Sequence, residues 1–274
     1  MGRTCGLSPA AYDPLVHIDS PGLATDLAIL ALEGSTVTDH GDHVVVRTDS
    51  NPTYYWGNFF ILEHAPEPDE IPTWIERFVE EFPEARHRAF AVLEVDADHS
   101  SWKRHGYTAE LDHALAATSL TPPAHPTDGV EVRELTSDDG WEQSAQLSSV
   151  DDETGDLEAR LTFERRRAAA ERGQSEAGQG RWFGAFVEGR LVARTGIVLL
   201  PPRARYRFVI THPDFRRRGI AGALVHAAGE WALAQPGIEQ VVIVADTAGP
   251  AINLYRSLGF REAGSHIGIE KPPV

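Results

Sequence analysis

The sequence predicts an α/β protein of two domains, each an α+β arrangement of helices on a mixed sheet. Three observations lead to this fold class. The chain has 274 residues, enough for two domains of ordinary size. Short β-branched runs alternate with segments of helical periodicity in both halves. A segment with three prolines and a glycine, residues 121–129, separates the halves and predicts a linker between domains 1–120 and 130–274.

The charge and hydrophobicity of the chain argue against nucleic-acid and membrane partners. Hydrophobic residues make up 42% of the chain, which supports full cores, and the formal net charge is −16. An acidic protein is a poor partner for nucleic acid. The same charge would suit a cationic amine substrate, although an acidic surface is also a common route to solubility. No apolar run approaches a membrane span and the start lacks an apolar signal core, so we expect no membrane partner and a cytoplasmic location.

Cysteine and histidine provide no evidence for redox or metal chemistry. Cys5 is the only cysteine, so it forms no internal disulfide. The twelve histidines are scattered without the spacing of a metal site. The sequence therefore predicts no metal.

Helix and strand patterns alternate in the first half. Thr73 is expected to cap its second helix. The loop after the second strand, residues 64–70, is acidic and rich in proline. In order, the predicted elements are a helix at 22–33, strands at 42–48 and 54–63, a helix at 74–82, a strand at 88–95, a short helix within 100–107 and a strand-like run to 117.

The second half has a clearer succession. Glu188 and Gly189 form a hairpin turn between two of its strands. The predicted order is a strand at 130–135, a helix at 136–147, a partly helical charged segment at 151–176, strands at 182–187, 190–200 and 205–211, a helix ending near 235, a strand at 241–244 and a helix beginning at 251.

The chain is organised around residues 205–235. A strand ends at Thr211, a turn with Pro213 follows, and the run R-R-R-G-I-A-G at 216–222 opens a helix. The first turn of a helix has backbone N–H groups without partners, and its dipole favours an anion there. Small residues let a phosphate approach the backbone, and arginines add forked donors. The stretch therefore predicts a phosphate-binding loop.

Two common phosphate loops are absent. The chain lacks G-x-G-x-x-G, and its only lysines, Lys103 and Lys271, exclude a Walker loop. R-x-x-G-x-A at 216–221 resembles instead the pyrophosphate loop of the GNAT family of N-acetyltransferases. The run A-I-N-L-Y-R-S-L-G-F at 251–260 resembles the second motif of that family. The resemblance covers about residues 129–270 and implies a GNAT fold in the C-terminal half.

The resemblance extends to the first half through element order alone. Strand, helix, strand and a short helix ending in W-K-R-H-G-Y resemble the later elements ending in L-Y-R-S-L-G-F. The first half is either a second, degenerate GNAT-like unit or an unrelated α/β extension. Residues 64–70 are acidic where phosphate would lie, so a first copy is not expected to bind CoA in this way.

The resemblance implies acetyl transfer from acetyl-CoA to an amine. It assigns the diphosphate to Arg216, Arg217, Arg218, Gly219, Ile220, Ala221 and Gly222, and the pantetheine and acetyl carbonyl to the backbone of Val209, Ile210 and Thr211. A backbone N–H would also stabilise the oxyanion. Tyr255 stands at the position of the tyrosine that protonates the leaving thiolate, as a phenol can. Ala248 replaces an asparagine common in the family, which leaves that cofactor contact in question.

No residue stands out as the base that deprotonates the amine. Asp152, Glu153 and His212 are candidates, and so is a water. With Cys5 as the only thiol, we expect direct transfer in a ternary complex. A small molecule or a peptide would serve as acceptor, and GNAT enzymes often form homodimers. The competing hypothesis is a non-catalytic CoA-binding sensor or interaction module, because fold alone does not establish function.

Overall fold

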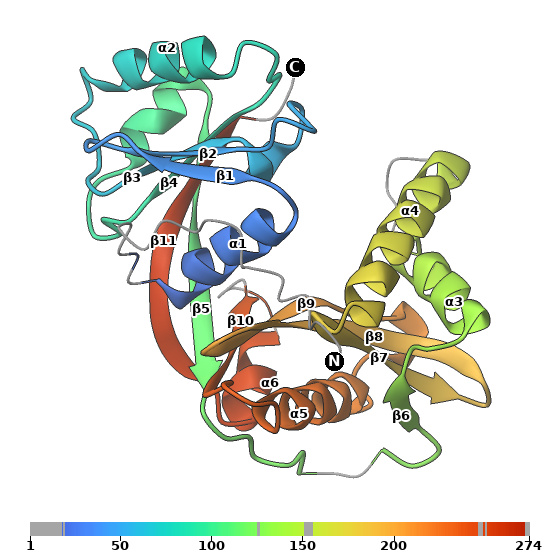
Figure 1. Ribbon diagram of the computed structural model, residues 1–274. Coiled ribbons are helices and arrows are strands. Elements are labelled where there is room, and N and C mark those ends of the chain that lie inside the picture. Colours follow the sequence, from blue (N-terminus) through green and yellow to red (C-terminus); the bar gives the residue numbers. More distant parts are fainter. Residues whose placement is uncertain are drawn as a thin grey trace, which may run out of the picture. The chain divides into compact units, whose positions relative to one another are not determined.

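The computed structural model describes residues 18, 20–124, 127–150, 156–245, 249 and 251–271. The chain divides into two compact units, each with helices packed on a sheet (Figure 1). Unit 1 comprises residues 1–114, 245–247 and 263–274, and unit 2 comprises residues 115–244 and 248–262.

Unit 1 has the strand order β1-β2-β3-β4-β11-β5. Strands β3 and β4 are parallel, whereas β1 and β2, β2 and β3, and β4 and β11 pair in antiparallel fashion. Its elements are α1 (Pro21–Leu32), β1 (Thr36–Asp39), β2 (Val44–Arg47), the 3-10 helix η1 (Tyr55–Gly57), β3 (Phe59–Leu62), α2 (Ile71–Glu81), β4 (Arg88–Val92), the 3-10 helix η2 (Ser100–His105), β5 (Thr108–Ala117) and β11 (Arg261–Lys271).

Both faces of the central strands β2, β3 and β4 are buried. Helices α1 and α2 lie on opposite faces (Figure 1). Side chains of a strand alternate between faces, so Phe60 packs with Phe78 of α2, whereas Phe59 packs with Leu27 of α1. This explains why β2, β3 and β4 have continuous apolar runs rather than an alternating pattern.

Several predictions in unit 1 differ from the structure. Strand β1 was not predicted, and the strand predicted at 88–95 ends at Val92. The strand predicted at 54–63 is limited to β3, because the amide of Asn58 bonds the carbonyl groups of Asn51 and Tyr54 (3.0 and 2.9 Å) and holds the preceding residues in a turn. Helix α2 begins at Ile71 and not after a Thr73 cap. Pro72 in its first turn needs no N–H partner and suits that start.

Unit 2 has the strand order β10-β9-β8-β7-β6. Helices α3 and α4 lie on one face of this sheet and α5 on the other (Figure 1). Its elements are β6 (Glu131–Glu134), α3 (Asp138–Ser148), α4 (Leu157–Glu176), β7 (Gly180–Val187), β8 (Arg190–Leu200), β9 (Arg203–Thr211), the 3-10 helix η3 (Pro213–Phe215), α5 (Ile220–Leu233), β10 (Gln240–Ala245) and α6 (Ala251–Ser257).

The contact between α5 and β9 is close. The hydroxyl of Tyr206 donates to the carbonyl of Val225 at 2.7 Å. A Cβ at Gly229 would lie 2.1 Å from that hydroxyl oxygen, so only glycine leaves room for the tyrosine. Burial raises the pKa of Tyr206 well above its ordinary value. The bond fixes the helix to the strand that precedes the predicted phosphate loop.

The C-terminal segment differs from the predicted domain limits. Residues 263–274 belong to unit 1, because β11 pairs with β4 over Ile267–Lys271. Of the predicted linker, Thr121 donates its N–H to the carbonyl of Leu258 at 2.9 Å, and a Cβ at Gly222 would lie 4.0 Å from Pro123. This part of the segment therefore packs along α5 and α6 of unit 2.

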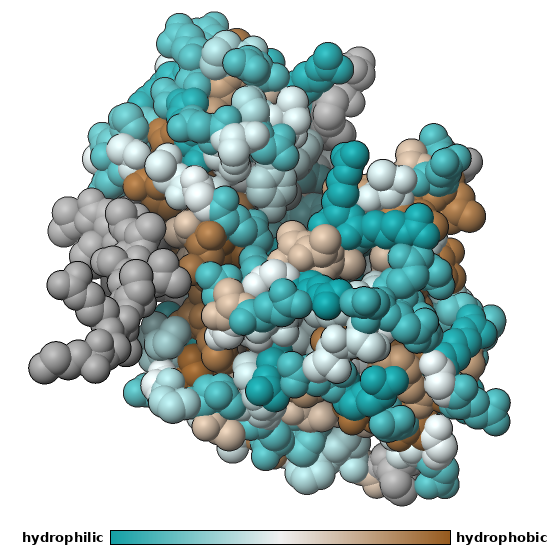
Figure 2. Space-filling view, turned by 45° about the vertical axis from the view of Figure 1, so that its right-hand side comes forward, coloured by the Kyte–Doolittle hydropathy of each residue, from teal (hydrophilic) through white to brown (hydrophobic). Residues whose placement is uncertain are grey.

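The surface agrees with the composition. Hydrophilic residues predominate on the face in Figure 2, with hydrophobic residues between them. Among the described residues, no helix has both the length and the apolar character to cross a bilayer.

Replacing Gly229 with alanine should lower the stability of unit 2 by about 1–3 kcal/mol, because the methyl group would overlap the Tyr206 hydroxyl and Leu120. Gly173→Ala is the matched control, since nothing lies within 4 Å of a Cβ at that position of α4. The control should gain up to about 1 kcal/mol from helix propensity. Urea unfolding followed by fluorescence measures both changes, and equal midpoints would contradict this packing.

Candidate functional site

Strands β9 and β10 separate along their length. In the described residues they pair in parallel only from Arg203 to Arg205 of β9, opposite Gln240–Val242. Strand β9 continues to Thr211 and β10 to Ala245. An opening therefore lies between the two carboxyl ends, where ligands bind in open α/β sheets.

Backbone groups of β9 face this opening. The N–H of His212 donates to the carbonyl of Val192 on β8 at 2.8 Å. Backbone direction alternates along a strand, so the N–H groups of Thr211 and Val209 point to the opposite side. The carbonyl of Thr211 lies on that side too and accepts a bond from Nε of Arg216 at 3.1 Å.

The loop after β9 leads directly into α5. Arg217 (φ 62°) and Gly219 (φ 78°) have left-handed backbone conformations, and Gly219 is the N-cap of the helix. No side chain caps this end, and the N–H of Ala223 is the first to reach a helical carbonyl, that of Gly219. The N–H groups of residues 220–222 are therefore free to bind an anion.

A cavity of about 670 Å³ joins the opening and the loop. Nine of the ten predicted cofactor residues line it together with Tyr255, the predicted acid. Arg218 does not line it and lies with its guanidinium 5.0 Å from the ring centre of Phe215. The lining residues are Val209, Ile210, Thr211, Phe215, Arg216, Arg217, Gly219, Ile220, Ala221, Gly222, Ala251, Leu254 and Tyr255.

Three residues that line the cavity were not predicted from the sequence, namely Phe215, Ala251 and Leu254. Ala251 and Leu254 share a face of α6 with Tyr255 by helical spacing, which is the signal that identifies them. A Cβ at Gly222 would lie 3.1 Å from Leu254, so the glycine allows α5 and α6 to approach.

Tyr255 is buried, with 6% of its surface exposed. Burial raises the pKa of Tyr255 to about 12, because the phenolate would lose its solvation. The side chain remains a neutral phenol at every physiological pH. It can therefore act as a proton donor in this cavity and not as a base.

The candidate bases fare differently. Asp152 and Glu153 lie outside the described residues, as does Ala248. The Nε2 of His212 lies 2.8 Å from a guanidinium nitrogen of Arg190, and its Nδ1 lies 3.3 Å from the backbone nitrogen of Asp214, so both ring nitrogens have a polar neighbour. The structure therefore gives His212 a bonded role beside the loop. Asn253 follows Ala248, the position at which the family often has an asparagine, by five residues, and it is exposed on α6.

A buried ionic network on the α4 face of the sheet was also missed. Its members on α4 stand at helical i,i+3 and i,i+4 spacing, but their partner Arg194 of β8 is distant in the sequence. Glu164 of α4 pairs with Arg160 and Arg167 at 2.7 and 2.5 Å, and Glu171 pairs with Arg194 of β8 at 2.5 Å. Burial raises the pKa of Glu164, while the nearby guanidinium groups oppose the shift. Arg194 is fully buried and lies opposite Ile210 of the cavity lining.

Strand β9 has an irregular register beside this network. Its pairing with β8 shifts between Arg194 and Gly196, and Phe208 has a φ of 52°. A positive φ is unfavourable for a large side chain, so the surrounding contacts must hold it. The Phe208 ring lies 4.4 Å from the guanidinium of Arg167.

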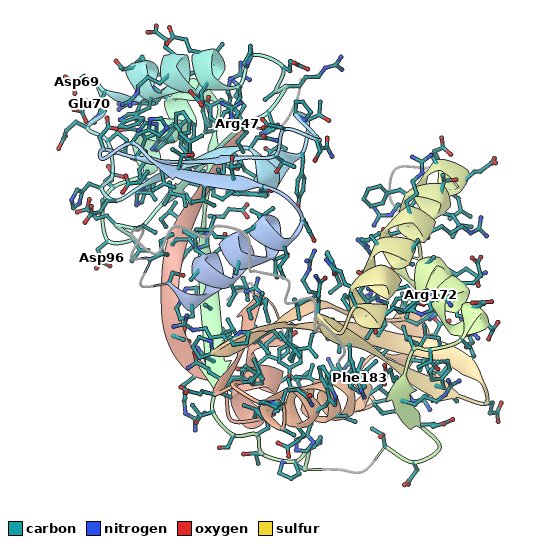
Figure 3. All side chains as sticks on the ribbon, viewed as in Figure 1. Arg47, Asp69, Glu70, Asp96, Arg172 and Phe183 are labelled. Carbon is teal, nitrogen blue, oxygen red and sulfur yellow. The ribbon has the colours of Figure 1, made fainter. Side chains whose placement is uncertain are left out.

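Unit 1 has a comparable strand pair without a comparable loop. Strands β3 and β4 are parallel and α2 connects them. The residues before α2 are acidic, and Figure 3 shows Asp69 and Glu70 projecting at its start. A cavity of about 680 Å³ near these strand ends is lined by Asp39, Asp42, Glu63 and Glu94 among others. These carboxylates would repel the negative charge of a diphosphate.

The comparisons identify a known family. Residues 146–260 match the model of the acetyltransferase (GNAT) family. None of the curated proteins matches the chain.

Solved structures match both units together. A GCN5-related N-acetyltransferase from Kribbella flavida matches with a TM-score of 0.66 and 18% identity, covering 92% of this chain and 95% of that one. A functionally unknown conserved protein from Staphylococcus epidermidis matches at 0.71 and 13%, covering 88% and 95%. A tandem GNAT protein from the clavulanic acid biosynthesis pathway matches at 0.53 and 14%, covering 90% and 87%. These likenesses show the fold and support a tandem arrangement of the two units.

Tyr255→Phe should make protein stability less sensitive to alkali. The pKa of Tyr255 is raised to about 12 in the fold from 10.0, so its contribution is complete below pH 10 and declines as pH rises towards 12. Urea midpoints of the wild type and the variant between pH 9 and 12 measure this. A parallel decline in the two proteins would show that the tyrosine is solvated.

Proposed function

Since the C-terminal half of the chain is a domain of the GNAT acetyltransferase family, we propose that the protein is an N-acetyltransferase that uses acetyl-CoA and a primary amine. The observation that supports this best is the single cavity that joins the free helix start of α5 to the open edge of β9. In this proposal, the N–H groups at the start of α5 hold the diphosphate and the N–H groups at the edge of β9 hold the thioester.

The loop is assigned to the diphosphate. The N–H groups of residues 220–222 would donate to phosphate oxygens, and Arg216 and Arg217 of the lining would supply positive charge. Gly219 and Ala221 keep the approach to the backbone open. Arg218 is exposed and acts, in this proposal, through the charge of the loop alone.

The edge of β9 is assigned to the pantetheine arm and the acetyl group. The N–H groups of Val209 and Thr211 face the opening and would bind carbonyl oxygens, as a donor to a developing oxyanion does. Ile210 contributes apolar lining. Tyr255 would protonate the departing thiolate, because its phenol keeps its proton below pH 10 and lines the same cavity.

The acceptor amine would attack directly in a ternary complex. The only thiol of the chain is Cys5, so no other cysteine is present to carry the acetyl group. An amine that is neutral on binding, or that loses its proton to water, needs no protein base. Unit 1 is proposed to shape the acceptor site or to form a homodimer. It is not proposed to bind CoA, because its cavity is acidic.

Gly219→Glu should weaken acetyl-CoA binding at least a hundredfold, because a carboxylate would occupy the proposed diphosphate position. Gly178→Glu is the matched control, since Gly178 has a similar φ of 73° and lies outside the cavity. Calorimetry with acetyl-CoA measures both. Micromolar binding by the wild type and the control alone supports the assignment. Equal binding by all three proteins places the cofactor elsewhere, and binding by none removes the proposed function.

Tyr255→Phe should lower kcat about 10²-fold or more and leave the Kd for acetyl-CoA within threefold, since the lost group donates only as the thiolate leaves. Release of CoA thiol with a panel of primary amines measures the rate. An unchanged kcat would assign Tyr255 to packing. Acetyl-CoA binding without turnover of any amine would favour the sensor alternative.

A further inference from the structure

An exposed group of aromatic and arginine side chains lies where α4 meets β9. Phe163 and Phe208 are 55% and 40% exposed, and they are the two phenylalanines among the exposed large hydrophobic side chains of the described residues. The guanidinium of Arg160 lies 5.6 Å from the Phe163 ring, and that of Arg167 lies 6.0 Å from the Phe163 ring and 4.4 Å from the Phe208 ring. These four residues are called the α4–β9 surface.

The α4–β9 surface has an excess of positive charge. Arg160 and Arg167 share the carboxylate of Glu164, and Arg194 pairs with Glu171, whose other oxygen lies 3.9 Å from Nε of Arg167. Three arginines thus oppose two glutamates, and one positive charge is in excess. Both glutamates are buried, while the side chains of Arg160 and Arg167 are 37% and 20% exposed. The excess charge is therefore available to a ligand, on a chain whose net charge is −16.

The surface lies next to the proposed point of transfer. Phe208 directly precedes Val209, which lines the cofactor cavity, so the two Cα atoms are about 3.8 Å apart. Phe208 contacts Arg167 of α4, on the sheet face opposite α5. The helix start assigned to the diphosphate belongs to α5. A ligand on the α4–β9 surface would thus approach the opening from the other face of the sheet.

We propose that the α4–β9 surface binds the acceptor and selects one that carries a carboxylate beside an apolar group, as an amino acid or a peptide C-terminus does. This inference rests on the proposed function and names its substrate class. The guanidinium groups of Arg160 and Arg167 bind the carboxylate, and the rings of Phe163 and Phe208 contact the apolar part.

Charge decides between this acceptor and others. A purely cationic amine would meet two guanidinium groups and would be repelled, which overrides the attraction expected from the acidic composition. One excess positive charge matches a monoanion.

The test separates recognition from turnover by using ligands without an amine. Binding of 3-phenylpropanoate and 3-phenylpropanamide, which differ in charge and hardly in shape, is measured by ligand-observed NMR on the full chain saturated with CoA. The acid should bind about tenfold more tightly than the amide. Arg160→Met should abolish this preference, whereas Phe208→Ala should weaken both ligands alike. Arg165→Met is the matched control, because Arg165 pairs with Glu142 outside this network.

Three outcomes would overturn the inference: equal binding of acid and amide, no binding of either, or a preference that survives Arg160→Met. Turnover of L-phenylalanine and L-phenylalaninamide is then compared with acetyl-CoA. Acetylation of the amide with no preference for the acid refutes the carboxylate assignment and retains the acetyltransferase. Selective binding of 3-phenylpropanoate without turnover of any amine supports the surface and refutes the proposed activity.

Discussion

The candidate site depends on where β9 and β10 stop pairing. Beyond Arg205 and Val242 the two strands share no described backbone bond, yet β9 remains fixed to β8 on its other side up to the His212–Val192 bond. The N–H groups of Val209 and Thr211 therefore keep fixed positions without a strand partner. Backbone donors held in this way are costly to leave unbonded and well placed to bind a ligand. The start of α5 adds a second set at the same opening.

Contacts on both faces of unit 2 hold this arrangement. On the α5 face, the bond from Tyr206 to Val225 joins strand and helix, with Gly229 making room for the phenol. On the α4 face, the Arg194–Glu171 pair lies opposite Ile210, and Arg167 contacts Phe208 at its strained φ. A buried ionic network adds little stability by itself, but removing one partner of a buried pair is strongly destabilising, because it leaves a buried charge without compensation. The same network gives one face of the opening its positive charge.

The two units have the same strand–helix–strand topology but different residues at the start of the connecting helix. Both have parallel strands joined by a helix, β3-α2-β4 in unit 1 and β9-α5-β10 in unit 2. In unit 2 the connecting helix follows glycine and arginines, whereas in unit 1 it follows Asp69 and Glu70. A diphosphate suits the first start and is repelled by the second. The proposed difference in diphosphate binding therefore rests on the residues before the helix and not on the shared topology.

The sequence by itself determined the order of most elements, the presence of two α/β halves and the loop at 216–222, because periodicity and local turn chemistry are encoded in neighbouring residues. It also placed Tyr255 on the helix that reaches the cavity. Only the tertiary structure decided that β11 returns to pair with β4, that Glu171 pairs with Arg194, and that Arg167 contacts Phe208. These contacts join residues distant in the chain. They are set by burial and by pairing between strands, which neighbouring residues in the sequence do not reveal.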